Sequence, residues 1–274
     1  MPATAKAAWI RRNLLSVVGA GLAFGLIGAC LVAPWLALAD PASINLSLGL
    51  QPPTADHWLG TDELGRDVLS RLLWGGRVSM TVAAVVLLVS LTMGVGVGVV
   101  SGYWGGLVDE LSMRLTDFIY ALPGIILALA LIGALGPSIP ALILALALSG
   151  WVTYARLARS LVLTVKTSDF VLAARSVGAT DGQIMRHHLL PALLGPVAVQ
   201  LSLDAGVTVL AIAGLSFLGL GIQPPTPEWG TMLVDARPFM DYAPHLVLPP
   251  GLAIFILVFG CNALSEGLEA WLRP

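Results

Sequence analysis

Few residues of this 274-residue chain could do chemistry, and they are scattered along it. The only lysines are Lys6 and Lys166, and neither follows a glycine, so the phosphate-binding pattern G-x-x-x-x-G-K-[ST] is missing. His187 and His188 are adjacent, but successive residues of a helix point about 100° apart, which disfavours a shared metal ion. The sequence therefore predicts neither ATP hydrolysis by this chain alone nor a metal site.

Two aspartates, Asp117 and Asp204, stand alone in apolar stretches that are long enough to cross a membrane. A charged side chain inside a bilayer is costly and usually faces protein or water. By helix rise, Asp204 lies near the middle of its stretch. Each aspartate therefore has two interpretations, a polar packing contact or a position on a translocation path. Their isolation disfavours a membrane-embedded enzyme, whose acids and histidines would cluster at membrane depth.

The elements that must position these residues are membrane helices. Hydrophobic residues make up 57% of the chain and charged residues 11%, less than half of the roughly 25% typical of soluble domains. A bilayer core about 30 Å thick needs roughly 20 apolar residues per helix. Six stretches reach this length: residues 14–36, 79–103, 111–135, 138–157, 193–220 and 246–268. The sequence thus predicts an all-α integral membrane protein, and its net charge of −2 disfavours nucleic acid as a partner.

The lysines and arginines predict which side of the membrane each end occupies. With the N-terminus in the cytoplasm, ten of the 14 basic residues lie inside: Lys6, Arg11, Arg12, Arg114, Arg156, Arg159, Lys166, Arg175, Arg186 and Arg273. The four that then lie outside are Arg66, Arg71, Arg77 and Arg237. Both termini are therefore expected in the cytoplasm.

This topology divides the chain into four parts. Residues 1–13 form a cytoplasmic tail, and residues 14–36 form a first transmembrane helix that is too long for a cleaved signal. Residues 37–78 form an outer loop with an amphipathic segment. Residues 79–274 form the core, which contains five spans and a polar cytoplasmic connection at 166–191.

Gly98 and Gly102 form a small-x-x-x-small step in the second predicted span. Such a step lets two helix backbones approach closely. Two interpretations are open, tight packing within the bundle or a moving face that lines a path.

The connection 166–191 predicts two short helices separated by a glycine. Ser168 or Asp169 can cap the first helix, and Gly178 ends it. The second helix starts near Thr180, and Pro191 marks the start of the next span. The groove of a partner protein could close around such a projection.

The same connection resembles the coupling motif of binding-protein-dependent ABC importer permeases. The resemblance rests on Leu172, Ala173, Ala174, Arg175, Gly178, Ile184, Leu190 and Pro191. Three further runs are similar to the peptide/nickel branch of that family: residues 57–67, 215–221 with 224–230, and 262–268. There are two departures. Many members have a glutamate where this chain has Leu172, and Gly-Asp where it has Ser265 and Glu266, so docking is expected to persist without an ionic contact at position 172.

The resemblance implies a type I ABC importer permease, a bundle of six transmembrane helices with a cytoplasmic coupling helix. Such a subunit is not an enzyme and binds no cofactor, because ATP and Mg²⁺ belong to two partner ATPase subunits. A second permease completes the path in the inner membrane. A solute-binding protein delivers di- or oligopeptides, or nickel and related metal chelates, from outside, and this chain looks somewhat more like the nickel-type members.

The alternative function is an ion-coupled secondary transporter. That class should show inverted repeats and broken midplane helices. Neither feature is visible in the sequence, and a cytoplasmic docking segment would have no role there.

Two outer segments are candidates for docking the binding protein or the second permease. The first holds the charged residues Asp62, Glu63, Arg66 and Asp67. Its alternative interpretation is an interfacial helix with intramolecular ion pairs. The second holds Glu228 and Trp229 at the end of a proline-rich stretch, and its alternative is a stiff loop with an aromatic anchor at the membrane interface.

Overall fold

The computed structural model describes residues 14–36 and 39–272, and the expected cytoplasmic tail 1–13 lies outside these ranges. Within them the fold is helical, and the only strand-like pairing is an isolated bridge between Thr61 and Asp67. Five helices are long and apolar enough to cross a membrane. They are α2 (Leu14–Val32), α3 (Val68–Trp104), α6 (Ile139–Val165), α9 (Leu190–Phe217) and α11 (Leu248–Leu272).

The third predicted span, residues 111–135, is not one straight helix. α4 (Gly106–Tyr120) and α5 (Gly124–Leu135) meet at a bend of 85°, and only as a pair are they long and apolar enough for a membrane span or a re-entrant loop. Pro123 lies at the break and is the N-cap of α5. Proline has no backbone N–H and disfavours helical backbone at the residue before it, so α4 cannot continue through Leu122.

α3 begins at Val68, so residues 68–78 of the predicted outer loop belong to a helix. Asp67 is its N-cap, because the carboxylate accepts hydrogen bonds from Ser70 N–H at 2.7 Å and from Ser70 Oγ at 2.8 Å. The part of the predicted amphipathic segment that follows Asp67 is therefore the first turns of α3.

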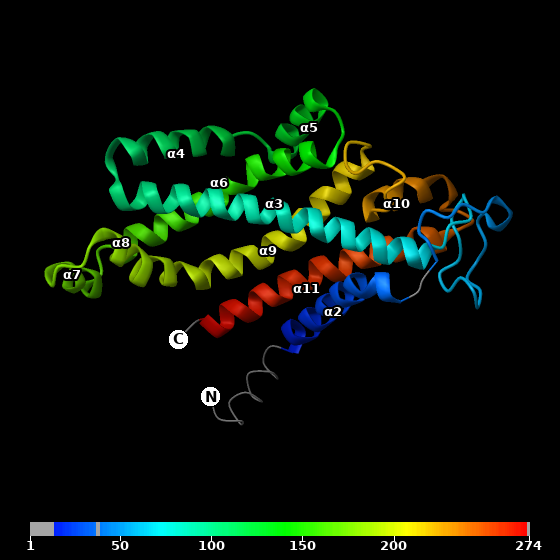
Figure 1. The fold of residues 1–274 in the computed structure, drawn as a ribbon, viewed down its shortest axis with the longest axis horizontal. Coiled ribbons are helices and arrows are strands. Elements are labelled where there is room, and N and C mark those ends of the chain that lie inside the picture. Colours follow the sequence, from blue (N-terminus) through cyan, green and yellow to red (C-terminus); the bar gives the residue numbers. More distant parts are fainter. Residues whose placement is uncertain (1–13, 37–38, 273–274) are drawn as a thin grey trace.

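The long helices run beside one another along the longest axis of the molecule (Figure 1). α3 packs along α6, and α11 packs against both α2 and α9. One end of the molecule holds the loop 39–67 and the short helix α10 (Trp229–Ala236), and the opposite end holds α7 (Asp169–Ser176) and α8 (Asp181–Ile184) (Figure 1). The predicted docking residues and the predicted coupling residues therefore lie at opposite ends.

Glycines let α3 and α6 approach closely. A Cβ atom at Gly94 would lie 2.3 Å from the carbonyl oxygen of Trp151, and one at Gly98 would lie 2.3 Å from that of Ala155. Gly102 faces the same helix one turn further along. Gly98 and Gly102 therefore belong to a helix–helix contact and are not among the residues that line the cavity described below, which supports the packing interpretation of the two glycines.

We expect Gly98→Ala to lower the stability of the protein, because the added methyl group would have to displace a carbonyl oxygen of α6. Overpacking of this kind costs about 1–3 kcal/mol. Gly96→Ala is the matched control, since nothing lies within 4 Å of a Cβ atom there. The midpoint of thermal unfolding in detergent measures both variants. Equal midpoints would contradict the close contact of α3 with α6.

Candidate functional site

The coupling segment, residues 166–191, folds as a helix, a glycine turn and a second helix, in the order that the sequence predicts. The turn after α7 is made by Gly178, whose φ of +90° would strain any residue with a side chain. This turn lets the Ala179 N–H donate to the Ala174 carbonyl oxygen at 3.1 Å. Thr180 then starts α8 in a capping box with Gln183. Local hydrogen bonds therefore determine the shape of the segment.

Three buried side chains, Val171, Ile184 and Leu189, attach the coupling segment to the bundle. They pack with Val99 of α3 and Val162 of α6 in one hydrophobic cluster. Because separating this cluster would expose apolar surface, the segment and the ends of these two helices are held together. Ile184 therefore positions the segment and does not lie on its surface.

The coupling segment has an exposed apolar face, and exposed charged residues such as Asp169 and Arg175 lie next to it in the sequence. Phe170, Leu172 and Val177 are 54%, 48% and 86% exposed. The other predicted coupling residues at the surface are Ala173, Arg175, Gly178, Leu190 and Pro191, and Ala174 is half-buried. Exposed apolar side chains that gather in this way are typical of a contact with another protein.

The coupling segment continues into α9 without a break. A π-helical turn, Met185–Leu189, joins α8 to α9, and Pro191 lies in the first turn of α9. Proline has no N–H to donate to a regular helical hydrogen bond. It is tolerated after this π-helical turn, in the first turn of α9, because the regular hydrogen-bond pattern is interrupted there. A helical connection thus leads from the exposed face of the segment to the middle of the bundle.

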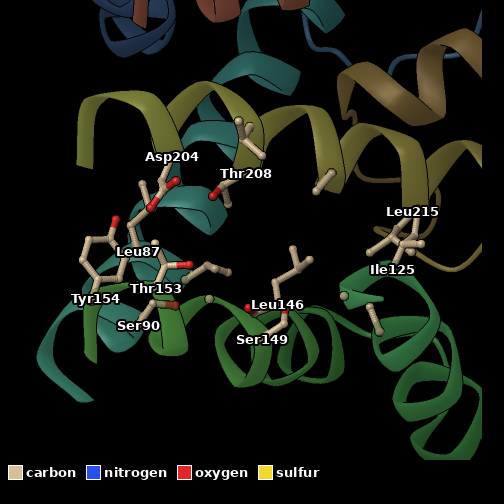
Figure 2. Close-up of a pocket in the computed structure, with 16 residues that line it drawn as sticks. Leu87, Ser90, Ile125, Leu146, Ser149, Thr153, Tyr154, Asp204, Thr208 and Leu215 are labelled. Carbon is tan, nitrogen blue, oxygen red and sulfur yellow. Dashed lines mark hydrogen bonds between the residues drawn. The ribbon is translucent and has the colours of Figure 1, made fainter. Parts of the chain in front are cut away.

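A cavity of about 250 Å³ lies between α3, α5, α6 and α9 (Figure 2). Its wall is mostly apolar. Its polar side chains are Ser90, Ser149, Thr153, Tyr154, Asp204 and Thr208. Only Asp204 is among the sequence predictions, although Ser149 with Thr153 and Asp204 with Thr208 stand four residues apart. That helical spacing of polar residues inside apolar spans is the signal that could have identified this wall.

The two membrane aspartates have different surroundings. Asp204 points into the cavity beside Tyr154 (Figure 2), and it accepts a hydrogen bond from Gln200 Nε2 at 3.0 Å. Asp117 lies on α4, outside the cavity wall, in an ion pair with Arg156. Asp204 therefore lines a cavity, whereas Asp117 joins two helices. Among the described residues, no three His, Cys, Asp or Glu side chains are grouped to hold a metal ion.

The charged residues of the first outer segment form a network of ion pairs. Arg66 Nε contacts Asp62 Oδ2 at 2.6 Å, and Arg66 Nη2 contacts Glu63 Oε1 at 2.9 Å. Arg71 contacts both Asp62 and Asp235 at 3.3 Å. Burial raises the pKa values of the Glu63 and Asp235 carboxyls, and the two arginines oppose this shift at Asp235. The network holds the loop 39–67 against α3 and α10.

The same residues are not an exposed docking surface. Asp62, Arg66 and Asp67 are buried, and Glu63 is half-buried. Besides capping α3, Asp67 contacts His57 Nδ1 at 2.9 Å through its second carboxylate oxygen. These contacts correct the docking interpretation of the four residues, and they support the alternative of intramolecular ion pairs, formed by a loop and not by an interfacial helix.

Glu228 and Trp229 are completely buried, which corrects their interpretation as a docking edge. Glu228 accepts hydrogen bonds from the Thr231 N–H at 3.0 Å and from Ser79 Oγ at 2.9 Å. Trp229 Nε1 donates to the carbonyl oxygen of Leu72 at 2.8 Å. The polar atoms of both side chains thus fasten α10 to α3. Glutamate is not among the preferred N-cap residues, so the sequence carried little sign of this role.

A family model described as a binding-protein-dependent transport system inner membrane component matches residues 94–274. The match includes the coupling segment and the two helices, α6 and α9, that form much of the cavity wall. The chain belongs to this family. It is a multi-pass membrane permease subunit of an ABC importer, and the hydrolysis of ATP belongs to a separate ATPase subunit. This membership decides against an ion-coupled secondary transporter.

Relatives match most of the chain. The dipeptide transport system permease protein of Alkalihalophilus pseudofirmus is 39% identical over 265 residues, which are 97% of this chain and 87% of the relative. The glutathione transport system permease protein of Escherichia coli O1:K1 / APEC is 39% identical over 268 residues, 96% and 88% of the two chains. The nickel transport system permease protein of Escherichia coli K12 is 42% identical over 244 residues, 89% and 88%.

The fold is similar to that of known ABC transporters. The inward-facing MetNI methionine ABC transporter matches with a TM-score of 0.61 at 20% identity, over 75% of this chain and 98% of the other. An amino acid ABC transporter matches with a TM-score of 0.54 at 17% identity, over 75% and 94%. Together with the family match, these similarities confirm the predicted fold class.

We expect Glu228→Ala to destabilise the protein, because it removes the cap of α10 and leaves the buried Ser79 hydroxyl without its acceptor. The combined loss should be about 2–4 kcal/mol. Asp241→Ala is the control, since it removes a carboxylate from an exposed position at the same end of the molecule. Thermal unfolding of both variants measures the difference. An equal loss in the two variants would show that Glu228 is not a buried cap.

Proposed function

We propose that this permease forms one half of a translocation path for small peptides or nickel and other metal chelates. In this proposal a second, similar permease forms the other half, and two ATPase subunits bind the coupling segments. A solute-binding protein delivers the cargo from outside an inner membrane. The observation that carries the proposal is the coupling segment, whose exposed apolar face is joined to the same helices that line the cavity.

The geometry supports a mechanical role for the coupling segment. ATP and Mg²⁺, held by the partner ATPases, supply the free energy. Val171 and Ile184 are completely buried against α3 and α6, so a displacement of the exposed face of the segment must move these helices with it. α9 carries the same displacement from Leu190 to Asp204, about 21 Å along the helix by its rise per residue. The two permeases would then rock between inward-open and outward-open states.

The orientation that we propose places the coupling segment and both termini in the cytoplasm. Within the described ranges, the basic residues at the segment's end of the molecule include Arg159, Lys166 and Arg186, as the positive-inside rule requires. The first residue of α2 and the last residue of α11 lie toward the same side, whereas α10 lies at the other end (Figure 1).

The cargo that we propose follows the named activities of the relatives, which are permeases for dipeptide, glutathione and nickel. Their identities to this chain lie between 39% and 42%, so identity alone does not choose among them. The cavity of about 250 Å³ lies just below the usual range for ligand sites, which suits a small solute or one end of a larger solute held between two permeases.

We expect Val177→Asp to prevent binding of the ATPase, because a charge would enter the apolar face that contacts it. Val177 is 86% exposed, so the substitution should not disturb the fold. Co-purification of the ATPases should fall by at least about tenfold. The control is Tyr242→Asp, which places the same charge on an exposed side chain at the α10 end of the molecule. Undiminished co-purification with Val177→Asp would refute the proposed contact.

Single cysteines at the two ends test the orientation. We expect Tyr242→Cys to react with a membrane-impermeant thiol reagent in intact spheroplasts, and Val177→Cys to react only after permeabilisation. The native Cys30 and Cys261 are buried, so the unmodified protein provides a low background. Tyr242 is preferable to Asp235 for this purpose, because Asp235 belongs to the ion-pair network. The reverse labelling pattern would invert the topology.

A further inference from the structure

The cavity wall contains a hydrogen-bonding group that the protein itself does not satisfy. Ser90 and Tyr154 are only 2% and 1% exposed; the Ser90 hydroxyl has no hydrogen-bond partner within the described residues, and the Tyr154 hydroxyl lies beside the Asp204 carboxylate. Both side chains line the cavity, one from α3 and the other from α6. An unsatisfied buried polar group costs about 1–3 kcal/mol, and such groups are rare in folded proteins. The unpaired Ser90 hydroxyl at this cavity, opposite the Tyr154–Asp204 pair, is a group that a ligand could satisfy.

Asp204 is the only carboxylic acid among the described residues that line this cavity. It lies on α9 and faces Tyr154 across the cavity end (Figure 2). Its Oδ1 atom accepts a hydrogen bond from Gln200, and the neutral Tyr154 hydroxyl is its other polar neighbour. Within the described residues, no lysine, arginine or histidine forms an ion pair with it. A carboxylate at membrane depth without a cation of its own protein is a candidate for binding one from a ligand.

The surrounding groups favour a particular kind of cation. Asp204, Tyr154 and Ser90 offer oxygen acceptors from three different helices, and a primary ammonium group carries three N–H donors with one positive charge. A divalent metal ion fits less well, because the described residues hold no group of three His, Cys, Asp or Glu side chains. The apolar remainder of the wall, including Val86, Leu87 and Ile125, can receive hydrocarbon.

We propose that this cavity binds the ammonium group of the transported solute, with Asp204 as the counter-charge and Tyr154 and Ser90 as hydrogen-bond acceptors. The inference rests on the proposed function, in which the cavity is part of the path. It adds that the permease itself selects solutes with a free amino group, such as a peptide with an unblocked N-terminus. A solute that lacks an ammonium group would leave the Asp204 charge without a partner in a cavity of low polarity.

The test uses the purified full-length chain and dicyclohexylcarbodiimide, which attacks carboxyl groups in apolar surroundings. The rate of modification at Asp204 is followed by peptide mass spectrometry, with Ala-Ala and N-acetyl-Ala-Ala added over the same concentration range. We expect Ala-Ala to slow the modification by at least about tenfold, and N-acetyl-Ala-Ala to leave it unchanged, because only the first carries an ammonium group. Asp204→Asn removes the modified site and identifies the signal.

Three variants test the assignment of the hydroxyl groups. Tyr154→Phe and Ser90→Ala should each raise the concentration of Ala-Ala needed for half protection by about five- to tenfold. Ser149→Ala is the matched control, because Ser149 lines the same cavity but donates to the Leu146 carbonyl oxygen of its own helix at 3.1 Å. It should leave the protection unchanged.

The inference is overturned if Asp204 is not modified, if Ala-Ala does not protect it, or if both peptides protect equally. These outcomes are separate from the test of the coupling segment. A permease that binds the ATPase through Val177 but shows no protection at Asp204 would keep the proposed function and lose the ammonium site. If Ala-Ala protects Asp204 but the Val177→Asp variant still binds the ATPase, the ammonium site is kept and the proposed ATPase contact is lost.

Discussion

The close contact between α3 and α6 is the interaction on which the other features of this permease depend. A Cβ atom at Gly94 would lie 2.6 Å from Cβ of Tyr154, so the contact that needs glycine also places Tyr154 at the cavity. Ser90 lies one turn before Gly94 on the same helix. Further along, Val99 and Val162 hold the coupling segment against the same two helices. One packed helix pair therefore supports both functional regions.

α9 connects these two regions through continuous helix. Its first turn follows the coupling segment, and its middle carries Asp204. A helix is stiffer than a loop because its successive backbone hydrogen bonds restrain bending, and the positions where this connection can bend are the π-helical turn at 185–189 and Pro196. The proposed conversion of ATPase movement into a change at the cavity needs no long-range signal beyond this helix and the contacts of its neighbours.

The sequence predicts well what local interactions and composition determine. Five of the six apolar stretches, the turn at Gly178 and the helix start at Thr180 agree with the structure, because each depends on residues within a few positions of one another. The coupling motif and the runs around it identify the family for a similar reason, since they are continuous in the chain. The break at Pro123 is also a local feature, since proline itself interrupts the helix. The proline is visible in the sequence, although the span was predicted as one helix.

The sequence alone did not predict which polar residues are buried or which distant residues are in contact. Arg71 meets Asp235 across 164 positions of sequence, and Trp229 meets Leu72 across 157, so nothing near these residues shows that they are inside the protein. An outer loop can contain the same charged and aromatic residues whether these side chains face a partner protein or the helices of their own chain. The cavity likewise brings Ser90, Tyr154 and Asp204 together from three helices. Composition and short-range patterns thus predicted a membrane bundle with a helix–glycine–helix segment, and the resemblance of motifs that are continuous in the chain indicated the permease family. The packing of helices determined which polar residues line the cavity and which hold the molecule together.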